Sequence, residues 1–277
     1  MTLPALVPGG SLLLAWQLRN KHVLLVGGGE VAASRLVHAK NADAHLTVMA
    51  PRGGLCAEMQ HRLATHAIDT YLDASFTQPS ELVCKETGAY YDMVLVAIDD
   101  PGLSRQLCAW CRELRIPVNV ADVPPECDFY FGSVLRRGPL QVLVSTGGKG
   151  PRIARLVRQR LEDALPPSVA DAIDNVGVLR AKLREMAPLP AQSHARMTWM
   201  SDVCDTYTLE QLAALDDAQM ARLLHGFASR TVPLHTSNGT LGTVHAYAAF
   251  VVGAAAMAAA IVCMSLVGKE DKGWIAL

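Results

Sequence analysis

A glycine-rich turn between an apolar run and a helical pattern restricts the fold more than any other stretch of this 277-residue chain. It lies in HVLLVGGGEVAASR, residues 22–35, where the apolar run predicts a buried strand and the residues after the glycines predict a helix. Gly27, Gly29 and Ala32 have the spacing of a nucleotide-binding turn. Its glycines let the backbone approach a pyrophosphate, and its small third residue lets helix and strand pack closely. The helix start then faces the anion, so the stretch predicts a dinucleotide-binding domain more strongly than a plain tight turn.

Further apolar runs continue the alternation of strands and helices that a parallel sheet requires. Residues 44–50, 91–98 and 116–121 predict three more strands, and residues 102–114 predict a helix between the last two. The connections are short enough for parallel crossovers. The sequence therefore predicts an α/β fold with a Rossmann-type parallel sheet, in which residues 53–90 form an irregular region.

Three aspartates follow the ends of predicted strands. Ligands of a parallel α/β sheet bind beyond the carboxyl ends of its strands, so Asp99, Asp100 and Asp122 are expected to rim the site where a nicotinamide would lie. For Asp99 and Asp100, an equally good explanation is that one of them caps the helix after Pro101. Asp122 is followed by Val-Pro-Pro, which predicts a turn at this point and no immediate helix.

The residues after the second strand leave the choice of coenzyme open. An acid at this position normally accepts the ribose hydroxyls of NAD, but this chain has Pro51 and Arg52 there. An arginine suits the 2′-phosphate of NADP, so these residues alone are compatible with either coenzyme.

Composition and residue spacing argue against several classes of function. The chain has 25 basic and 26 acidic residues, so no overall charge favours nucleic acid as a partner. Its seven cysteines form no framework, which favours free thiols in a reducing compartment. Cys108 and Cys111 form a C-x-x-C pair inside a predicted helix, where core packing explains them better than a redox or zinc role. The histidines are dispersed, and the sequence predicts no resident metal site.

Three blocks of the sequence resemble the siroheme-synthesis family, and the pattern is most similar to the fungal bifunctional precorrin-2 dehydrogenase/sirohydrochlorin ferrochelatases. The blocks are Asn119-Val-Ala-Asp122, Cys127-Asp-Phe-Tyr-Phe131 and Ser145-Thr-Gly-Gly148, and the likeness extends over roughly residues 10–225. The resemblance implies NAD-linked oxidation of precorrin-2 to sirohydrochlorin, followed by Fe²⁺ insertion to give siroheme. It also implies a homodimer, with iron as a passing substrate.

The resemblance further implies roles for individual residues. Asp122 takes the place of the family's catalytic aspartate, which is implicated in both reactions. A carboxylate suits this chemistry, because the oxidation removes a hydride and a proton and metal insertion releases N–H protons. The family manages without an acid after the second strand, which favours NAD over NADP. Together with the glycine turn and the strand ends, the predicted coenzyme contacts are Gly27, Gly28, Gly29, Glu30, Val31, Pro51, Arg52, Ala97 and Asp99.

A basic, glycine-rich stretch is the predicted site for the substrate. Precorrin-2 carries many carboxylates, which require cations and backbone donors. Residues 145–160, STGGKGPRIARLVRQR, provide both at the start of a helix, where anions are favoured. Arg158 and Arg160 are better explained as a solvated helix face. The predicted substrate contacts are Ser145, Gly147, Gly148, Lys149 and Arg152.

The pattern changes to helices after Pro166-Pro167. Ser168, Thr208 and Asp216 stand at expected helix starts, the last two with the spacing of capping boxes. The predicted segments are a NAD-binding domain at 1–125, a dimerisation segment at 126–165, a helical domain at 166–230, a linker at 231–245 and an apolar helix at 246–267.

The segment 246–267 carries no charge and, as a helix, is long enough to cross a hydrocarbon layer of ~30 Å. It predicts a C-terminal membrane anchor, with the catalytic part in the cytoplasm. The alternative is an alanine-rich helix packed in the dimer. The siroheme-synthesis family does not need such a tail. Two other functions stay open at this point, a dehydrogenase without chelatase activity and a membrane-tethered NAD-binding sensor without turnover.

Overall fold

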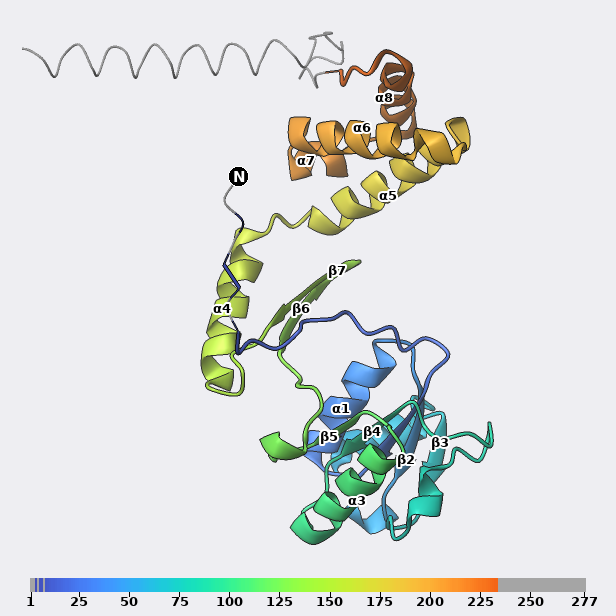
Figure 1. The fold of residues 1–277 in the computed structure, drawn as a ribbon, viewed down its shortest axis with the longest axis vertical. Coiled ribbons are helices and arrows are strands. Elements are labelled where there is room, and N and C mark those ends of the chain that lie inside the picture. Colours follow the sequence, from blue (N-terminus) through green and yellow to red (C-terminus); the bar gives the residue numbers. More distant parts are fainter. Residues whose placement is uncertain (1–2, 4, 7, 234–277) are drawn as a thin grey trace, which may run out of the picture. The chain divides into compact units, whose positions relative to one another are not determined.

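The computed structural model describes residue 3, residues 5–6 and residues 8–233 (Figure 1). These residues form two compact units that interleave along the chain. The first contains the described residues up to Ser133 together with Ser145–Ala154. The second contains Val134–Val144 and the described residues from Arg155 onward. The domain boundaries expected from the sequence stay predictions.

The first unit is built on a five-stranded sheet in which all neighbouring strands are parallel. The strand order is β3-β2-β1-β4-β5, so the direction of winding switches between β1 and β4. This arrangement confirms the predicted α/β fold with a parallel sheet. The strands are β1 (His22–Val26), β2 (His45–Met49), β3 (Thr70–Leu72), β4 (Met93–Val96) and β5 (Val118–Val120).

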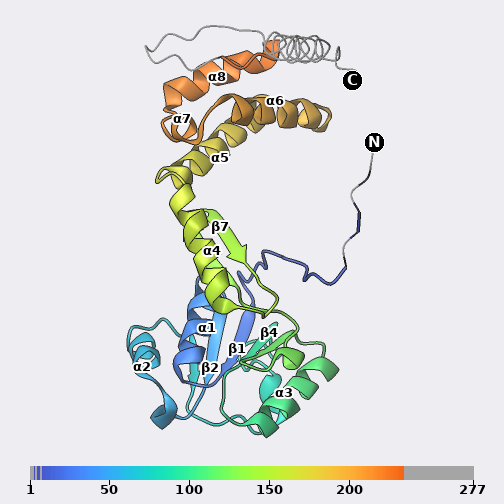
Figure 2. The same ribbon diagram turned by 90° about the vertical axis from the view of Figure 1, so that its left-hand side faces the viewer.

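Helices cover both faces of this sheet (Figure 2). In β1, Val23 and Leu25 belong to the core under α1 and α2, whereas Leu24 and Val26 belong to the core under α3. Successive strand residues point to opposite faces, so burial on both faces explains why the strands read as continuous apolar runs. The helices are α1 (Glu30–Lys40), α2 (Ala57–Ala64) and α3 (Pro101–Glu113).

Residues 53–90 are more regular than the sequence predicts. They contain α2, β3 and the short helix η2 (Pro79–Leu82), and η1 (Arg52–Gly54) overlaps their start. The longest of these elements has 8 residues, which is too short for a clear helical or strand periodicity. Met59 and Leu82 are fully buried and attach α2 and η2 to the core.

The C-x-x-C pair lies in the core, which confirms the packing interpretation. Cys108 and Cys111 are on the face of α3 that packs against the sheet, and both side chains are buried. Burial raises the pKa of the Cys111 thiol to about 12. Because the thiolate is the reactive form, Cys111 is chemically inert at neutral pH.

The second unit contains a two-stranded sheet and a group of helices. Arg137, at the end of the first strand, donates to the main-chain oxygens of Glu162 and Leu165, which attaches the strand to the end of α4. Buried Leu179, Leu183 and Trp199 form the middle of the helical core. The elements, of which β6 and α4 begin in the first unit, are β6 (Ser133–Arg137), β7 (Leu140–Val144), α4 (Pro151–Ala164), α5 (Val169–Met186), η4 (Pro190–Gln192), α6 (Ser193–Thr206), α7 (Leu209–Ala213) and α8 (Asp217–Ser229).

The helix starts follow the predicted capping pattern, with one exception. Thr208 accepts a hydrogen bond from the Gln211 amide, and Asp216 accepts one from the Gln219 amide, so both predicted capping boxes are confirmed. Ser168 precedes α5 as predicted, but its side chain makes no capping hydrogen bond.

Within the part of the chain that the structure describes, no helix has the length and apolarity needed to span a membrane. The predicted anchor at 246–267 lies outside the described residues, as does the predicted linker beyond residue 233.

Candidate functional site

The carboxyl ends of the five strands form one edge of the first unit's sheet. Gly27 directly follows β1 and Ala97 directly follows β4, so both lie where the winding of the sheet switches. The Ala97 amide donates to Val26 O (2.8 Å), and the Gly27 amide donates to Met49 O (3.0 Å). The register confirms the shared edge, because the residues aligned across it from β3 to β5 are Leu72, Met49, Val26, Val96 and Val120.

The glycine turn is held tightly between two neighbouring segments. A Cβ atom on Gly27 would lie 2.0 Å from Ala97 O, and the residue has a left-handed φ of +123°. A Cβ atom on Gly28 would lie 2.6 Å from the side chain of Leu55 and 3.0 Å from Gly54 O. These two glycines are therefore required by the packing of the protein itself.

Gly29 is different, because a Cβ atom on this residue would contact nothing within 4 Å. It is the N-cap residue of α1, and no side chain caps the helix. The amides of the first helical turn point away from the helix body without an intrahelical acceptor. A glycine that the protein does not need for its own packing, before an uncapped helix, fits the close approach of a pyrophosphate. Glu30 and Val31 form the start of this helix, as predicted, and both are exposed.

Asp122 lies in the turn after β5, at the same edge of the sheet. Its φ is +59°, a left-handed value that Asp tolerates better than most residues, and its side chain is exposed. The turn leads to the short helix η3 (Pro124–Glu126), whose N-cap is Val123. Asp122 therefore caps no helix, as predicted.

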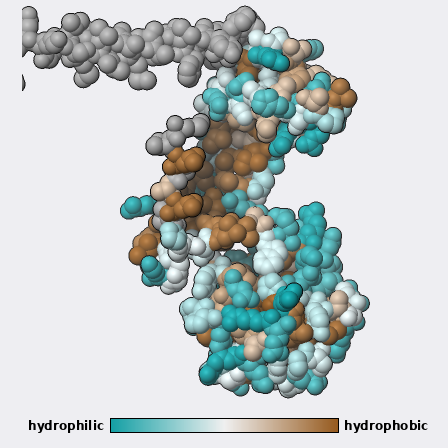
Figure 3. Space-filling view, viewed as in Figure 1, coloured by the Kyte–Doolittle hydropathy of each residue, from teal (hydrophilic) through white to brown (hydrophobic). Residues whose placement is uncertain are grey.

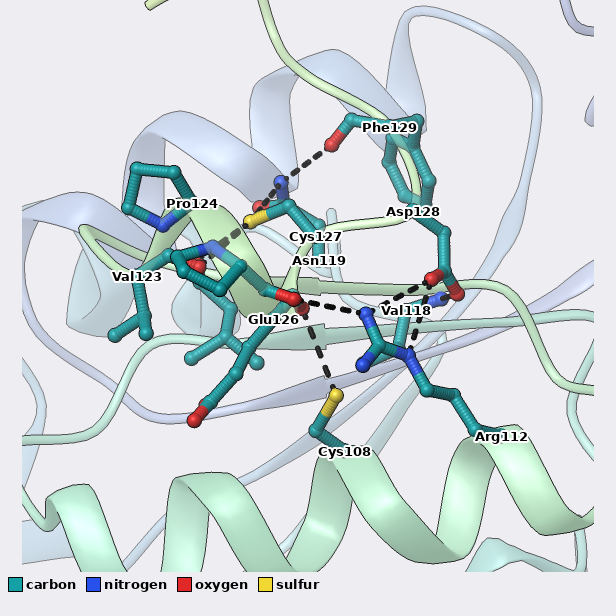
Figure 4. Close-up of polar contacts among 12 residues, drawn as sticks. Cys108, Arg112, Val118, Asn119, Val123, Pro124, Glu126, Cys127, Asp128 and Phe129 are labelled. Atoms are coloured by element: carbon teal, nitrogen blue, oxygen red, sulfur yellow. Dashed lines mark hydrogen bonds and ion pairs between the residues drawn. The ribbon is translucent and has the colours of Figure 1, made fainter.

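Hydrogen bonds fix the segment that follows Asp122 (Figure 4). Asp128 Oδ2 accepts from the Val118 amide (3.0 Å), and Asp128 Oδ1 pairs with Arg112 Nη2 (3.3 Å). The buried Asn119 side chain donates to Phe129 O (2.8 Å), and Cys127 Sγ donates to Val120 O at 3.0 Å. These contacts join residues 127–129, on the C-terminal side of the loop, to β5. The turn that carries Asp122 therefore has a fixed base.

Arg35 is a charged neighbour of Asp122 that the sequence prediction missed. Its guanidinium lies 4.1 Å from the centre of the Phe131 ring, and its buried Nε has no hydrogen-bond partner among the described residues. Burial lowers the pKa of Arg35, while the charges of Cys127 and Asp122 act in the opposite direction. Burial also lowers the pKa of His38, and the charge of Arg35 adds to this effect. A desolvated positive charge therefore lies near the Asp122 carboxylate.

An acid does lie next to the residues that follow β2, and this acid is Asp73, which directly follows β3. Asp73 Oδ1 accepts from the Arg52 amide (2.7 Å), and Asp73 Oδ2 lies 3.5 Å from Arg52 Nε. The Arg52 guanidinium lies 5.6 Å from the centre of the Tyr71 ring. Arg52 is therefore paired with an acid, which the sequence did not indicate. Pro51 precedes η1 and is exposed.

The two acids after β4 have different surroundings. Asp100 Oδ1 accepts from the amides of Gly102 (2.8 Å) and Leu103 (3.0 Å), so Asp100 is the residue that caps α3. Asp99 is not the cap, and its side chain is exposed beside Ala97 at the carboxyl end of β4. A coenzyme contact by Asp99 stays a prediction.

The predicted substrate stretch belongs to the same compact unit as Asp122. Gly147 and Gly148 have left-handed φ values of +59° and +79°, and they form the loop before α4. Thr146 Oγ1 accepts a hydrogen bond from the Gly150 amide (3.2 Å), and this bond within the loop stabilises its conformation. The predicted substrate contacts Ser145, Gly147, Gly148, Lys149 and Arg152 are all exposed.

The helical part of the second unit has a pocket of about 440 Å³ between α5 and α6. Arg180 and Arg184 line it from α5 and are exposed, whereas Arg196 donates to Ala187 O and Leu189 O. Asp205 lines the same pocket from α6, so its lining carries charges of both signs.

Three family models match the chain in succession. A putative NAD(P)-binding family matches residues 14–133, the central family of sirohaem biosynthesis proteins matches residues 137–164, and the C-terminal family of the same proteins matches residues 166–233. The fold and the site define a Rossmann-type nucleotide-binding protein with a carboxylate at the coenzyme edge.

Individual proteins of known family are also similar to this chain. Siroheme biosynthesis protein met8 of Schizosaccharomyces pombe is 46% identical over 224 residues, which cover 81% of this chain and 82% of that protein. This chain belongs to the siroheme biosynthesis family. A siroheme synthase of a Psychrobacter species is 33% identical over 189 residues, which cover 67% of this chain and 36% of that protein. The solved structure of SirC, a precorrin-2 dehydrogenase, has the same fold, with a TM-score of 0.58 at 18% identity over 79% of this chain and all of SirC.

Proposed function

We propose that this protein oxidises precorrin-2 to sirohydrochlorin with NAD⁺ and then inserts Fe²⁺ to give siroheme. The observation that carries the proposal is the position of Asp122, an exposed carboxylate on a fixed turn at the edge that holds the glycine turn. Membership of the siroheme biosynthesis family and the match to an NAD(P)-binding family support it.

Asp122 is the proposed base in both steps. In the first step the substrate loses a hydride and a proton. NAD⁺, which the glycine turn before α1 would hold, would supply the hydride acceptor. The Asp122 carboxylate takes the proton and, being exposed, passes it to water. In the second step Fe²⁺ replaces two N–H protons of the macrocycle, and the same carboxylate accepts them in turn. Arg35 contributes positive charge near Asp122.

The carboxylates of the substrate need positively charged side chains to bind them. Lys149 and Arg152, both exposed, supply this charge at the start of α4.

A direct assay tests the function. Purified protein supplied with precorrin-2 and NAD⁺ is expected to form NADH and sirohydrochlorin in equal amounts. Addition of Fe²⁺ or Co²⁺ is then expected to give the metallated product faster than in a control without protein. If NADH forms but metal insertion is not accelerated, the protein is a dehydrogenase alone. Coenzyme binding without turnover, and without an absorbance shift of added tetrapyrrole, would instead identify a sensor.

The pairing of Arg52 with Asp73 favours NAD over NADP. The Asp73 carboxylate neutralises the arginine that a 2′-phosphate would need, and it repels that phosphate. Asp73→Asn is expected to raise the ratio of NADPH affinity to NADH affinity by roughly tenfold. That factor corresponds to about 1.4 kcal/mol, a modest share of such a charge–charge interaction. The measurement is a fluorescence titration with NADH and NADPH. Glu58→Gln, which removes an exposed carboxylate paired with Arg62, is the matched control; an unchanged ratio in Asp73→Asn would contradict this reading.

An apolar face on α4 supports the proposed homodimer. Figure 3 shows hydrophobic residues gathered over α4 and the β6–β7 sheet. Ile153, with 60% of its surface exposed, and Val157 lie on one side of the helix, and the polar Arg155 lies on the other. A large exposed apolar stripe requires a partner surface, and a second copy of the chain supplies an identical one. The apolar residues on this surface are Val134, Leu143, Ile153, Leu156, Val157 and Leu161.

Val157→Glu is expected to weaken dimerisation by roughly 100-fold, because an unpaired charge in an apolar interface costs at least about 3 kcal/mol. Sedimentation equilibrium measures the dissociation constant. Arg155→Glu on the opposite side of α4 is the control and should leave the dimer intact. Equal dissociation constants for the wild type and Val157→Glu would remove this face from the interface.

The membrane anchor predicted for 246–267 remains part of the proposal. The apolar composition of that segment supports it. Phase partition of the full chain in detergent, compared with a chain ending at Gly242, distinguishes an anchor from a helix packed in the dimer.

A further inference from the structure

Three side chains with metal-ligand chemistry converge at the other edge of the sheet, where β1 begins. His22 is the first residue of β1, and Cys84 and Glu86 lie in the loop after η2. Their ligand atoms lie within 4.8 Å of one another, with 3.6 Å between Cys84 Sγ and His22 Nδ1 and 3.9 Å between Glu86 Oε2 and His22 Nδ1. We propose that His22, Cys84 and Glu86 bind a Zn²⁺ ion.

The separation of the thiol and imidazole ligand atoms fits tetrahedral zinc. Bond lengths of about 2.3 Å to sulfur and about 2.0 Å to nitrogen, at the tetrahedral angle, place the two atoms about 3.5 Å apart. The distance between Cys84 Sγ and His22 Nδ1 is 3.6 Å. The Glu86 oxygen is farther from the nitrogen than zinc requires by a few tenths of an ångström, and its exposed side chain is free to rotate inward.

A hydrogen bond between the thiol and the imidazole accounts for only one of the two contacts at His22 Nδ1. Both Cys84 Sγ and Glu86 Oε2 approach the same atom, His22 Nδ1, which holds either one proton or one lone pair. That nitrogen has capacity for one hydrogen bond. Three donor atoms around a common centre are the arrangement that a bound cation produces.

Two of the three ligands are held in place by the surrounding structure. The His22 amide donates to Asp92 Oδ2 (2.9 Å), and the His22 ring stacks on the His45 ring with a centroid distance of 5.0 Å. The amide of Cys84 donates to Ala89 O and its carbonyl accepts from the Gly88 amide, both at 2.8 Å. Ligands whose orientation is already fixed lose little entropy when they bind a metal.

Zinc is the ion that this donor set favours. A thiolate, an imidazole and a carboxylate are together typical of Zn²⁺, while Mg²⁺ and Ca²⁺ prefer oxygen alone. The Cys84 side chain is buried and Glu86 is largely exposed, so solvent reaches the cluster from the glutamate side and supplies a fourth ligand as water. The ion would tie the loop 84–89 to the start of β1. The cluster lies at the edge opposite Gly27, so it does not depend on the proposed reaction.

Cobalt provides a spectroscopic test on the full-length chain, stripped of metal by chelation and kept reduced, with no tetrapyrrole present. One equivalent of Co²⁺ is expected to give the near-ultraviolet thiolate-to-cobalt band and the visible bands of tetrahedral Co²⁺. Added Zn²⁺ is expected to bleach them at one ion per chain. Cys84→Ser should lose the thiolate band. The control Cys204→Ser, which removes an exposed thiol from the second unit, should retain it.

A second variant tests the site independently, in case Cys84→Ser fails to fold. Glu86→Gln changes an exposed side chain, and it is expected to keep the thiolate band while lowering Zn²⁺ affinity at least ~10-fold in a chelator competition. Absence of a thiolate band in the wild type would overturn the site. So would a band that persists in Cys84→Ser, or a Zn²⁺ affinity that Glu86→Gln leaves unchanged.

Discussion

Asp122→Asn is expected to lower the rates of precorrin-2 oxidation and of metal insertion by about 10²–10⁴-fold, the usual contribution of a positioned general base. Asparagine has the same shape and tolerates the left-handed φ of +59°, so the turn should keep its conformation. The variant loses the negative charge and, with it, the ability to accept a proton. Affinity for NAD⁺ should be unchanged. Stopped-flow measurement of NADH formation and of sirohydrochlorin metallation gives the two rates.

Asp43→Asn is a matched control for this variant. Asp43 also has a left-handed φ, +61°, and it lies before β2 in an exposed pair with Arg19. The substitution repeats the chemical and conformational change away from the carboxyl edge and should leave both rates unaltered. Full dehydrogenase activity in Asp122→Asn would exclude Asp122 from the oxidation. A loss confined to one reaction would show that the two steps use different bases.

Gly27→Ala is expected to destabilise the first unit by about 3–5 kcal/mol. The new Cβ atom would lie 2.0 Å from Ala97 O, which forces β1 and β4 apart, and alanine is strained at a φ of +123°. A loss of this size is a large part of the stability of a typical domain, so coenzyme binding should fail as well. Urea unfolding followed by circular dichroism measures the change.

Gly29→Ala separates stability from coenzyme binding. The Cβ atom added at Gly29 meets no protein atom within 4 Å, and its backbone, with φ −81°, is acceptable for alanine. The variant is therefore expected to unfold at nearly the wild-type urea concentration but to bind NADH more weakly, because the added methyl group hinders the pyrophosphate. If Gly27→Ala is as stable as Gly29→Ala, the packing of the glycine turn against Ala97 is not tight in solution.

The parts of the site that depend on local sequence rules were predictable. Gly27 and Gly29 follow an apolar run and open a helix, and those neighbours alone define a nucleotide-binding turn. Asp122 precedes two prolines, which require a turn. The parallel sheet then places both at one edge, since the carboxyl ends of its strands coincide.

The missed residues depend on the order of the strands and on contacts between distant segments. Arg35 lies on α1, contacts Phe131 and is close enough to Asp122 for the two charges to interact, although the two residues are far apart in the sequence. Asp73 pairs with Arg52 because β3 lies next to β2, and a strand of three residues leaves no readable pattern. His22 and Cys84 are 62 residues apart, so no spacing rule connects them. Side-chain proximity of this kind follows from the fold and not from local sequence.

The interleaving of the two units means that neither is encoded by one uninterrupted stretch of chain. The polypeptide chain passes from the first unit to the second after Ser133, re-enters the first unit at Ser145 and passes to the second again after Ala154, within α4. A fragment that ends at Ser133 keeps Asp122 and loses the glycine loop before α4. A fragment that begins at Arg155 lacks the β6–β7 sheet. Cleavage of the chain at either junction therefore separates residues that belong to the same compact unit.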